Sequence, residues 1–483
     1  MKLKELLRGI EVLESNAPLE LDICGVSSAS QNVCAGGLFV AVVGYVTDGH
    51  RYIPDAVAHG AVAVLCEREA PLDVPYIKVA DTRKALAQLG VNWNGDPSAA
   101  MTVIGVTGTN GKTSVTTLLK TVLEKSLHAK VGLIGTVENK IGAETLPSER
   151  TTPESFELQG LLAQMREAGC THAVMEVSSH ALALHRVDGV RFDIGAFTNL
   201  TEDHLDFHHT MEEYRRAKAK LFRQCQTGVF DLDSDVAPRM IADASCRVFT
   251  VGLDENADLR GEAVHLAADR IEMDVRQGSE RAHLRLGIPG RFTVSNALVV
   301  LGIAHCLGIA LPEAVAALSE AKGVKGRIEV VPTPDKPYTV LIDYAHTPDG
   351  LENVLRSVRD FCTGRLIVLF GCGGDRDRSK RPIMGEIAVR CADFVIVTSD
   401  NPRTEDPIAI IEEILAGMRE TKTPYLVEPD RRRAIRSALR YAKKDDIIVL
   451  AGKGHETHQI LGKEKVPLDE REEVAAALCE IRE

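Results

Sequence analysis

The sequence predicts an α/β protein of three domains. Its 483 residues exceed what one hydrophobic core usually organises. From Met101 onward, short apolar runs alternate with helical patterns, and this alternation is typical of a parallel, doubly wound sheet. The alternation is interrupted at residues 324–337, which are rich in Pro, Gly and charge, and it then resumes. We therefore expect two open α/β sheets preceded by a smaller N-terminal α/β domain.

The first predicted domain spans residues 1–97. Residues 1–15 read as a short amphipathic helix without the apolar core of a signal peptide. Strand-like runs follow at 38–44 and 61–67. Residues 93–101 are polar and rich in turn-forming residues, and we place the domain boundary there.

The second predicted domain, residues 98–325, holds the central P-loop sheet. Its predicted elements are the helix 112–127 and strands within 101–108, 129–137, 171–179 and 193–200. The third, residues 326–483, is predicted to be Rossmann-like. Its apolar runs each end in a Gly, Asp or His cluster, and such strand ends carry the site in open α/β sheets.

Composition narrows the classes of partner. The formal charge is −12, with 57 basic and 69 acidic residues, which argues against a nucleic-acid partner. The eleven cysteines are scattered without a C-x-x-C pair, so we expect reduced, mostly buried thiols in a cytoplasmic protein. Since no run of about 18 apolar residues occurs, we expect no membrane span.

The strongest motif is a phosphate-binding turn, GVTGTNGKT, from Gly105 to Thr113. Glycines let backbone N–H groups point at phosphate oxygens, and the following helix adds its positive end. Its spacing differs from the common P-loop, because Val106 stands where that pattern has glycine. The alternative is a glycine-rich turn without a ligand. We predict a site for ATP or GTP made by Gly108, Thr109, Asn110, Gly111, Lys112 and Thr113.

Hard metal ligands follow two later strands. Glu176 ends one apolar run, and Asp203 and His204 follow the next. Mg²⁺ prefers oxygen ligands and retains several waters, so one carboxylate plus phosphate oxygens can hold it. The alternatives are an exposed acid at Glu176 and a locally hydrogen-bonded imidazole at His204. On its spacing alone, Lys218 in the helical pattern 212–222 reads as a solvated lysine.

A family resemblance becomes specific when the motifs are taken in order. They are TGTNGKT, EVSSHAL, TNLTEDHLDFH, YRRAKAKLF, GR-x-E, DYAHTPDGL, GDRDRSKRPIMG, SDNPRTEDP and AGKGHE. From about residue 22 to 472 the chain resembles the Mur ligases, and within them the MurE branch. That resemblance implies domains for the UDP-linked substrate, ATP and the incoming amino acid. It also implies transfer of the ATP γ-phosphate to a substrate carboxylate, and attack of an amine on the resulting acyl phosphate.

The resemblance also implies residue roles. Lys112, Lys218, Glu176 and His204 match catalytic positions, with Lys218 the lysine that the family carbamylates to N6-carboxylysine. Thr113, Glu176 and His204 match the Mg²⁺ ligands. The remaining ATP contacts match Asn296, Arg327 and Asp343, with His346 beside them. The family positions that face the UDP-linked muramoyl peptide correspond to Ser30, Thr151, Thr152, Ser178 and Arg186. Where the family has Asp-Ser-Arg, this chain has Ala29, Ser30 and Gln31, so only the serine is retained.

The stretch SDNPR indicates which amino acid is added. It resembles the signature of relatives that add meso-diaminopimelate, which carries a carboxylate that lysine lacks. Arg403 can bind that carboxylate bidentately, and Asp400 and Asn401 can bind the ammonium beside it. The alternative is a plain Asn-Pro turn. The full set of residues implied for this amino acid is Arg376, Asp400, Asn401, Pro402, Arg403, Gly452 and Glu456.

Three rival readings stay open at this point. One is a lysine-adding relative, and another is a folylpolyglutamate synthase-like ligase with the same acyl phosphate chemistry. The third is a P-loop GTPase or regulatory ATP-binding module without ligase activity. We expect a monomer that uses ATP and Mg²⁺, whose partners are the UDP-linked muramoyl dipeptide and diaminopimelate.

Overall fold

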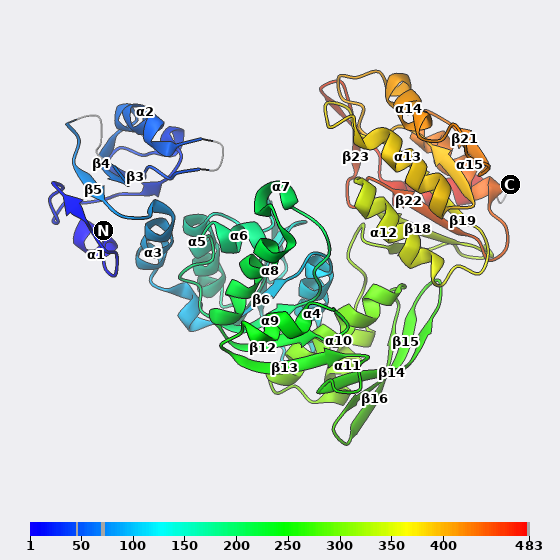
Figure 1. Cartoon of the computed structure of the whole chain (residues 1–483), viewed down its shortest axis with the longest axis horizontal. Coiled ribbons are helices and arrows are strands. Elements are labelled where there is room, and N and C mark those ends of the chain that lie inside the picture. The colour runs from blue at the N-terminus through cyan, green and yellow to red at the C-terminus, as the bar shows by residue number, and fades with distance from the viewer. Residues whose placement is uncertain (45–46, 69–72, 481–483) are drawn as a thin grey trace. The chain divides into compact units, whose positions relative to one another are not determined.

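The computed structural model describes residues 1–44, 47–68 and 73–480. It divides into two compact units, Met1–Thr250 and Val251–Glu483, and the boundary falls inside strand β13 (Arg247–Gly252). Each unit contains parallel sheets covered by helices (Figure 1), which confirms the predicted α/β class. The three ranges 1–97, 98–325 and 326–483 remain a prediction about domain limits.

The first unit begins with a small five-stranded sheet of order β1-β5-β4-β3-β2. Four strands are parallel: β2 (Val26–Ser27), β3 (Gly37–Val40), β4 (Ala61–Cys66) and β5 (Tyr76–Lys78). The edge strand β1 (Glu14–Ser15) is antiparallel to β5. Helices α1 (Leu3–Leu6) and α3 (Thr82–Asn94) share one core, and α2 (Ile53–Ala58) joins the other.

The predicted N-terminal helix over residues 1–15 is wrong in length. Only Leu3–Leu6 is helical, because Gly9 adopts a positive φ of 77° and the chain then extends into β1. Pairing of Glu14 with Lys78 replaces helical hydrogen bonds at this point.

The larger sheet of the first unit is parallel at its centre, in the order β7-β10-β6-β11-β12. These strands are β7 (Val131–Ile134), β10 (His172–Glu176), β6 (Thr102–Thr107), β11 (Phe192–Phe197) and β12 (Cys225–Asp231). Two short antiparallel strands, β8 (Asn139–Ile141) and β9 (Glu144–Leu146), extend it beyond β7. Since the central strands are parallel, their carboxyl ends meet at one edge, where the loops after β6, β7, β10 and β11 lie.

Five helices of this unit carry or support the predicted site. They are α4 (Lys112–Ser126), α5 (Ser155–Glu167), α6 (Ser179–Ala183), α7 (Leu205–His208) and α8 (Met211–Ala219). Helix α4 follows β6 directly, with Gly111 as its N-cap at a φ of 87°. Burial of Val115, Leu118 and Leu119 fixes its apolar side toward the sheet.

The second unit begins with an antiparallel meander, β14 (Leu259–Leu266), β15 (Ile271–Gln277) and β16 (Glu280–Leu286). Helices α10 (Arg291–Cys306) and α11 (Leu311–Ser319) pack on it. A six-stranded sheet of order β17-β18-β22-β19-β20-β21 follows, parallel except for β17 (Glu329–Val331). Its parallel strands are β18 (Thr339–Asp343), β19 (Leu366–Phe370), β20 (Phe394–Val397), β21 (Tyr425–Val427) and β22 (Ile447–Ala451).

Both faces of this sheet are covered by helices, as a doubly wound fold requires. One core includes α12 (Pro348–Arg359), α13 (Lys380–Cys391) and α14 (Pro407–Ala416). The other includes α15 (Arg431–Tyr441) and α16 (Glu470–Glu480). A hairpin of β23 (His458–Leu461) and β24 (Glu464–Pro467) follows β22. The predicted Rossmann-like sheet is thereby confirmed.

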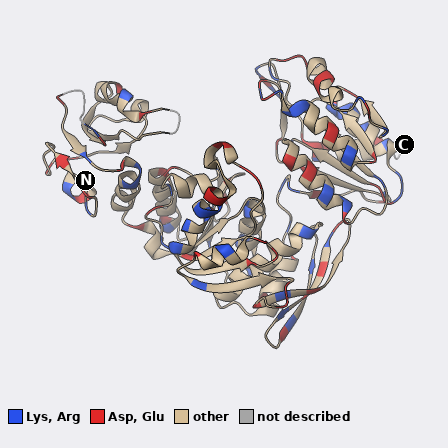
Figure 2. Cartoon of the chain, viewed as in Figure 1, with Lys and Arg blue, Asp and Glu red and all other residues tan. Residues whose placement is uncertain are grey.

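Charged residues are distributed over both units, and most cysteines are at least partly exposed. Lys and Arg are intermixed with Asp and Glu along the helices of each unit (Figure 2). All eleven cysteines lie in the described ranges as free thiols, but only Cys66, Cys170 and Cys372 are buried, so the expectation of mostly buried thiols is wrong. Within those ranges we find no helix with the length and apolar character that crossing a bilayer demands.

A fully buried ion pair ties α15 to α16. Arg431 and Glu470 have no exposed side-chain surface, and their Nη2 and Oε1 atoms lie 2.7 Å apart. Glu470→Ala should lower the free energy of unfolding by about 3–5 kcal/mol, because the Arg431 charge would stay buried without its partner. The exposed pair Arg436–Glu480 is the control, where Glu480→Ala should change it by about 0–1 kcal/mol. Denaturant titration measures both, and equal losses would contradict the expectation.

Candidate nucleotide and amino-acid sites

The phosphate-binding turn follows β6 and is held by the segment after β11. Gly108 has a φ of 153°, and a Cβ there would lie 1.9 Å from Thr198 Oγ1, so only glycine fits. Thr109 N donates to Asn199 O at 2.9 Å, and Asn110 N donates to Asn199 Oδ1 at 2.9 Å. The turn is therefore fixed by the backbone and side chain of Asn199 before α4 begins.

Two lysines converge on the carbonyl of Gly108. Lys112 Nζ donates to Gly108 O and to Thr109 O, both at 2.9 Å. Lys218 Nζ donates to Gly108 O at 2.7 Å and lies 4.5 Å from the centre of the Tyr214 ring. Lys218 is only 1% exposed, so the interpretation of a solvated lysine is wrong. Burial, and then the nearby Lys112 charge, hold the pKa of Lys218 well below its ordinary value.

Glu176, the last residue of β10, is buried rather than exposed at the strand end. It is 1% exposed, and its carboxylate accepts from Thr136 N at 2.8 Å and Thr136 Oγ1 at 3.0 Å. Thr136 follows β7, so neighbouring parallel strands supply both groups. A Cβ on Gly135 would lie 2.6 Å from Glu176 Oε1, which shows how closely that loop approaches the carboxylate.

The residues predicted to face the muramoyl peptide surround Glu176. Thr152 Oγ1 donates to Glu176 O at 2.9 Å, and Ser178 N donates to Thr152 Oγ1 at 3.1 Å. Thr151 Oγ1 lies 3.0 Å from Thr136 Oγ1, and Arg186 Nη1 donates to Thr152 O at 3.3 Å. Four of the five predicted residues therefore lie together. The fifth, Ser30, is buried in the small N-terminal sheet domain at 5% exposure.

His204 belongs to a group of imidazole and aromatic rings. Its ring centre lies 4.8 Å from that of His180 and 6.1 Å from that of Tyr214. Its Nδ1 lies 3.3 Å from Asp203 Oδ1, and burial lowers the pKa of His204 although Asp203 opposes the change. A neutral imidazole can donate a lone pair to a metal. Tyr214, whose hydroxyl lies 3.1 Å from Thr109 Oγ1, was missed although it is the first residue of the YRRAKAKLF motif, because nothing in that motif indicates which loop the ring contacts.

The predicted ATP contacts of the second unit lie just before β17, at and after the end of β18, and on α10. Asp343 is 8% exposed and accepts from Ile328 N and Ala345 N, both at 2.9 Å. Burial raises the pKa of Asp343. The Arg327 guanidinium lies over the Tyr344 ring at 5.3 Å, and His346 follows in the same loop. Asn296, at 4% exposure, is buried within α10.

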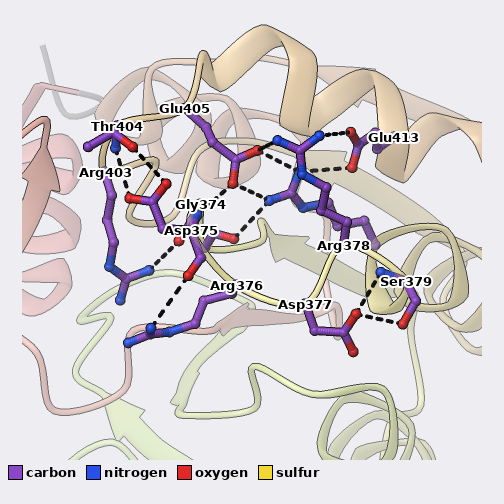
Figure 3. A network of polar contacts seen from close by, with 12 residues as sticks. Gly374, Asp375, Arg376, Asp377, Arg378, Ser379, Arg403, Thr404, Glu405 and Glu413 are labelled. Atoms are coloured by element: carbon purple, nitrogen blue, oxygen red, sulfur yellow. Dashed lines mark hydrogen bonds and ion pairs between the residues drawn. The ribbon is translucent and has the colours of Figure 1, made fainter.

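Two loops at strand ends carry the two arginines predicted to contact the incoming amino acid, of which Arg403 is predicted to bind its second carboxylate (Figure 3). Arg403 follows β20, has a φ of 51°, and donates from Nη1 to Gly374 O at 2.8 Å. Arg376 lies in the loop after β19, and its Nη1 donates to Asp375 O at 3.4 Å. A non-glycine residue at positive φ costs free energy and is held by its surroundings.

A network of hydrogen bonds and ion pairs joins these two loops. The Asp375 carboxylate accepts from Thr404 N at 3.2 Å and from Thr404 Oγ1 at 2.7 Å. Glu405 accepts from Asp375 N at 2.5 Å and pairs with the fully buried Arg381 at 2.9 Å. Figure 3 shows the Glu405 side chain directed from its own loop toward Asp375 and Arg378 of the other. Arg381 and Glu405 were not predicted, although both lie inside motifs that the sequence displays.

The loop after β22 meets the Asp-Asn-Pro-Arg turn from the other side. Lys453 Nζ donates to Asn401 Oδ1 and to Glu456 Oε2, both at 2.9 Å. Asn401 Nδ2 also donates to Glu456 Oε2 at 2.9 Å, and Ile460 N donates to Asn401 Oδ1 at 3.0 Å. The predicted residues Asp400, Asn401, Pro402, Gly452 and Glu456 therefore lie together.

The donor set of the first unit is compatible with Mg²⁺. Glu176 and Thr113 offer oxygen ligands, and His204 offers a nitrogen. The described residues contain no group of three or more His, Cys, Asp or Glu side chains able to hold a metal. A small number of protein ligands is enough for Mg²⁺ bound beside a nucleotide, because that ion keeps several waters and takes phosphate oxygens as further ligands.

Three family models match successive parts of the chain. The Mur ligase family, catalytic domain, matches residues 22–93, the Mur ligase middle domain matches 106–304, and the Mur ligase, glutamate ligase domain, matches 326–454. A protein of Caldanaerobacter subterraneus subsp. tengcongensis named UDP-N-acetylmuramoyl-L-alanyl-D-glutamate–2,6-diaminopimelate ligase is 46% identical over 99% of both chains. Its namesake in Clostridioides difficile is 44% identical over 98% of both.

Solved structures give the same picture. A structure of a UDP-N-acetylmuramoyl-L-alanyl-D-glutamate–2,6-diaminopimelate ligase superposes with a TM-score of 0.74 at 31% identity, over 100% of this chain and 99% of that one. The folylpolyglutamate synthase of Mycobacterium tuberculosis, complexed with ADP and AMPPCP, has a TM-score of 0.59 at 16% identity. It covers 77% of this chain and 92% of its own, and at that identity the likeness concerns the fold alone.

Proposed function

Since this chain belongs to the Mur ligase family, we propose that it adds meso-diaminopimelate to the D-glutamate carboxylate of UDP-N-acetylmuramoyl-L-alanyl-D-glutamate, with ATP as the energy source. The observation that carries this proposal is the likeness, over nearly the whole chain, to ligases named for that reaction. The product is a precursor of peptidoglycan. We propose in addition that the protein is a monomer and acts in the cytoplasm.

The chemistry proceeds in two steps. A carboxylate resists attack by an amine because its leaving group would be oxide. A carboxylate oxygen therefore attacks the γ-phosphorus of ATP, which gives an acyl phosphate and releases ADP. The neutral amine of diaminopimelate then attacks the acyl carbon, the C–O bond to phosphate breaks, and the nitrogen loses a proton. The products are an amide, ADP and inorganic phosphate.

The first unit supplies the groups that hold phosphate. The N-terminus of α4, which begins after Gly111, would offer its first backbone N–H groups to phosphate oxygens, and Lys112 would offset the repulsion between a carboxylate and ATP. Thr113, Glu176 and His204 are the residues that would hold Mg²⁺, which supplies charge neutralisation on the phosphates when bound. Arg186 and its threonine and serine neighbours orient the acceptor peptide.

Lys218 fits a carbamate, in which its amine bonds to the carbon of CO₂ and releases a proton. The buried, neutral amine that such a reaction needs is favoured by the low pKa of Lys218. A carbamate would replace this neutral amine with a negatively charged group beside Gly108.

Intact-mass measurement of the native protein should show an increment equal to CO₂ that disappears in Lys218→Ala. That variant should also lose about a hundredfold in kcat, as when one charged group is removed from an active site. Lys220→Ala is the control, because Lys220 Nζ donates to Leu182 O instead. An unmodified native mass in CO₂-saturated buffer would contradict the assignment.

The second unit supplies the groups for the amino acid. Arg403 and Arg376 provide cations for the second carboxylate of diaminopimelate, and Asp400, Asn401 and Glu456 surround the position for the ammonium beside it. A site built on such an arginine rejects lysine, because lysine leaves the guanidinium unpaired. This distinguishes the proposal from a lysine-adding ligase.

The test is phosphate release with purified protein, ATP, the UDP-linked dipeptide and either diaminopimelate or lysine. We expect release to depend on diaminopimelate and a heavy-oxygen label in the acceptor carboxylate to appear in the phosphate. Equal rates with lysine would support the lysine-adding rival, and activity on folylglutamate the folylpolyglutamate synthase rival. Hydrolysis independent of any amino acid would support a nucleotide-binding module without ligase activity.

A further inference from the structure

The fully buried Lys453 serves no step of the reaction described above. Its ammonium has no exposed surface and lies 2.9 Å from Asn401 Oδ1, 2.9 Å from Glu456 Oε2 and 3.5 Å from Asp400 Oδ1. A buried charge of this kind is costly unless it is paired and hydrogen-bonded. Three residues assigned to the amino acid are thus contacted by one cation.

The Asp400 carboxylate is only partly satisfied by these contacts. Asp400 is 7% exposed, and its Oδ1 accepts no hydrogen bond from the part of the chain that the structure describes. A Cβ added at Gly452 would lie 3.8–4.0 Å from the Asp400 carboxylate, so this glycine leaves the approach to the acid unobstructed. A buried acid with an unused acceptor oxygen beside a glycine is suited to a cationic group of a ligand.

The cluster of Asp400, Glu456 and Lys453 is negatively charged, which favours binding of an ammonium group. The carboxylates of Asp400 and Glu456 against the ammonium of Lys453 leave one net negative charge. Burial would raise the pKa of Glu456, but hydrogen bonds from Lys453 and Asn401 lower it overall, so Glu456 stays ionised. Without Lys453, the buried Asp400 carboxylate and the partly exposed Glu456 carboxylate would repel each other with no cation to offset the repulsion.

We propose that Lys453 is a positioning residue for recognition of the second amino group of the incoming amino acid. It fixes the side chains of Asn401 and Glu456 and offsets part of the negative charge of the two acids, so that the cluster presents one net negative charge to an ammonium. The inference rests on the proposed function, because it concerns the same amino acid. It adds selection for the second ammonium to the selection for the second carboxylate by Arg403.

The experiment compares diaminopimelate with 2-aminopimelate, which lacks only the second amino group. For wild type, kcat/KM should favour diaminopimelate by about a hundredfold or more, since a site that binds an N–H group rejects an analogue without it. In Lys453→Met the ratio should fall to below about ten, mainly through KM for diaminopimelate, with KM for ATP unchanged. Loss of fold alone would not change one KM selectively.

Lys120→Met is the matched control. Lys120 is also buried, at 9% exposure, but it belongs to α4, and its hydrogen bond and ion pair are with Glu124 rather than with a residue assigned to the amino acid, so its variant should keep the wild-type ratio. If Lys453→Met does not fold, Glu456→Gln replaces it: this change keeps the side-chain shape, removes the net charge, and should lower the same ratio.

The outcomes separate the two claims. A wild type that does not respond to diaminopimelate overturns the proposed function and this inference with it. A wild type that responds, while folded Lys453→Met or Glu456→Gln keeps the preference over 2-aminopimelate, overturns this inference alone. A lowered ratio in Lys120→Met equal to that in Lys453→Met would also overturn it.

Discussion

Lys112→Met is expected to reduce kcat by about a thousandfold or more, the largest effect of any single substitution considered for this chain. The Lys112 ammonium lies at the start of α4 and already contacts the carbonyls of Gly108 and Thr109, which form the phosphate-binding turn. Methionine keeps the length of the side chain and removes its charge. The developing charge on the transferred phosphoryl group would then lose its nearest protein cation in this turn.

The measurement is phosphate release at saturating substrates, together with nucleotide binding. Lys125→Met, on the last turn of the same helix, is the control and should keep wild-type turnover. Thermal unfolding should be similar for both variants, because neither substitution opens a cavity. Turnover within tenfold of wild type in a folded Lys112→Met protein would contradict the role assigned to this lysine.

Arg403→Ala is expected to raise KM for diaminopimelate by about a hundredfold to a thousandfold, and to leave KM for ATP unchanged. Arg403 is held at positive φ by Ile460 and Gly462 backbone groups and by Gly374 O, so its guanidinium is placed before the substrate binds. In this variant the second carboxylate of diaminopimelate has no arginine partner. Binding of lysine is unaffected, because lysine has no second carboxylate.

The diagnostic quantity is therefore the ratio of kcat/KM for diaminopimelate to that for lysine, which should approach one in Arg403→Ala. Arg390→Ala is the control, because Arg390 is exposed on α13 and pairs with Glu352. If lysine were discriminated against as strongly after Arg403→Ala as before, another group would carry the selection. Arg376 would be the next residue to test.

The sequence predicted those parts of the site that depend on local motifs at strand ends. The phosphate-binding turn, Glu176 at the end of β10 and the Asp-Asn-Pro-Arg turn after β20 are specified by short stretches of glycine, acid and proline at the ends of apolar runs. The carboxyl ends of parallel strands meet at one edge, so the strand pattern was enough to predict that residues after neighbouring strands would gather there.

Residues whose environment depends on distant segments were not predictable. The helical pattern around Lys218 looks amphipathic, and on that basis the lysine would be solvated. Instead, α8 packs against the turn after β6, and the buried Lys218 binds Gly108, which lies 110 residues earlier in the sequence. Lys453 and Arg381 lie inside recognisable motifs, but their buried ion pairs join loops from separate strands. Helical periodicity describes one helix face and contains no information about which loop covers it.

The buried Arg431 has a practical consequence for work with this protein. Besides Glu470, it contacts Ser399 O at 3.3 Å and Ala451 O at 2.9 Å, which precede the Asp-Asn-Pro-Arg turn and the Gly452–Glu456 loop. Removal of α16 would leave Arg431 without Glu470. It would thereby disturb the two strand ends that carry the amino-acid site, even though no residue of that helix is assigned to a substrate. Fragments prepared for ligand screening or labelling should keep α16 intact, with any affinity tag joined beyond it.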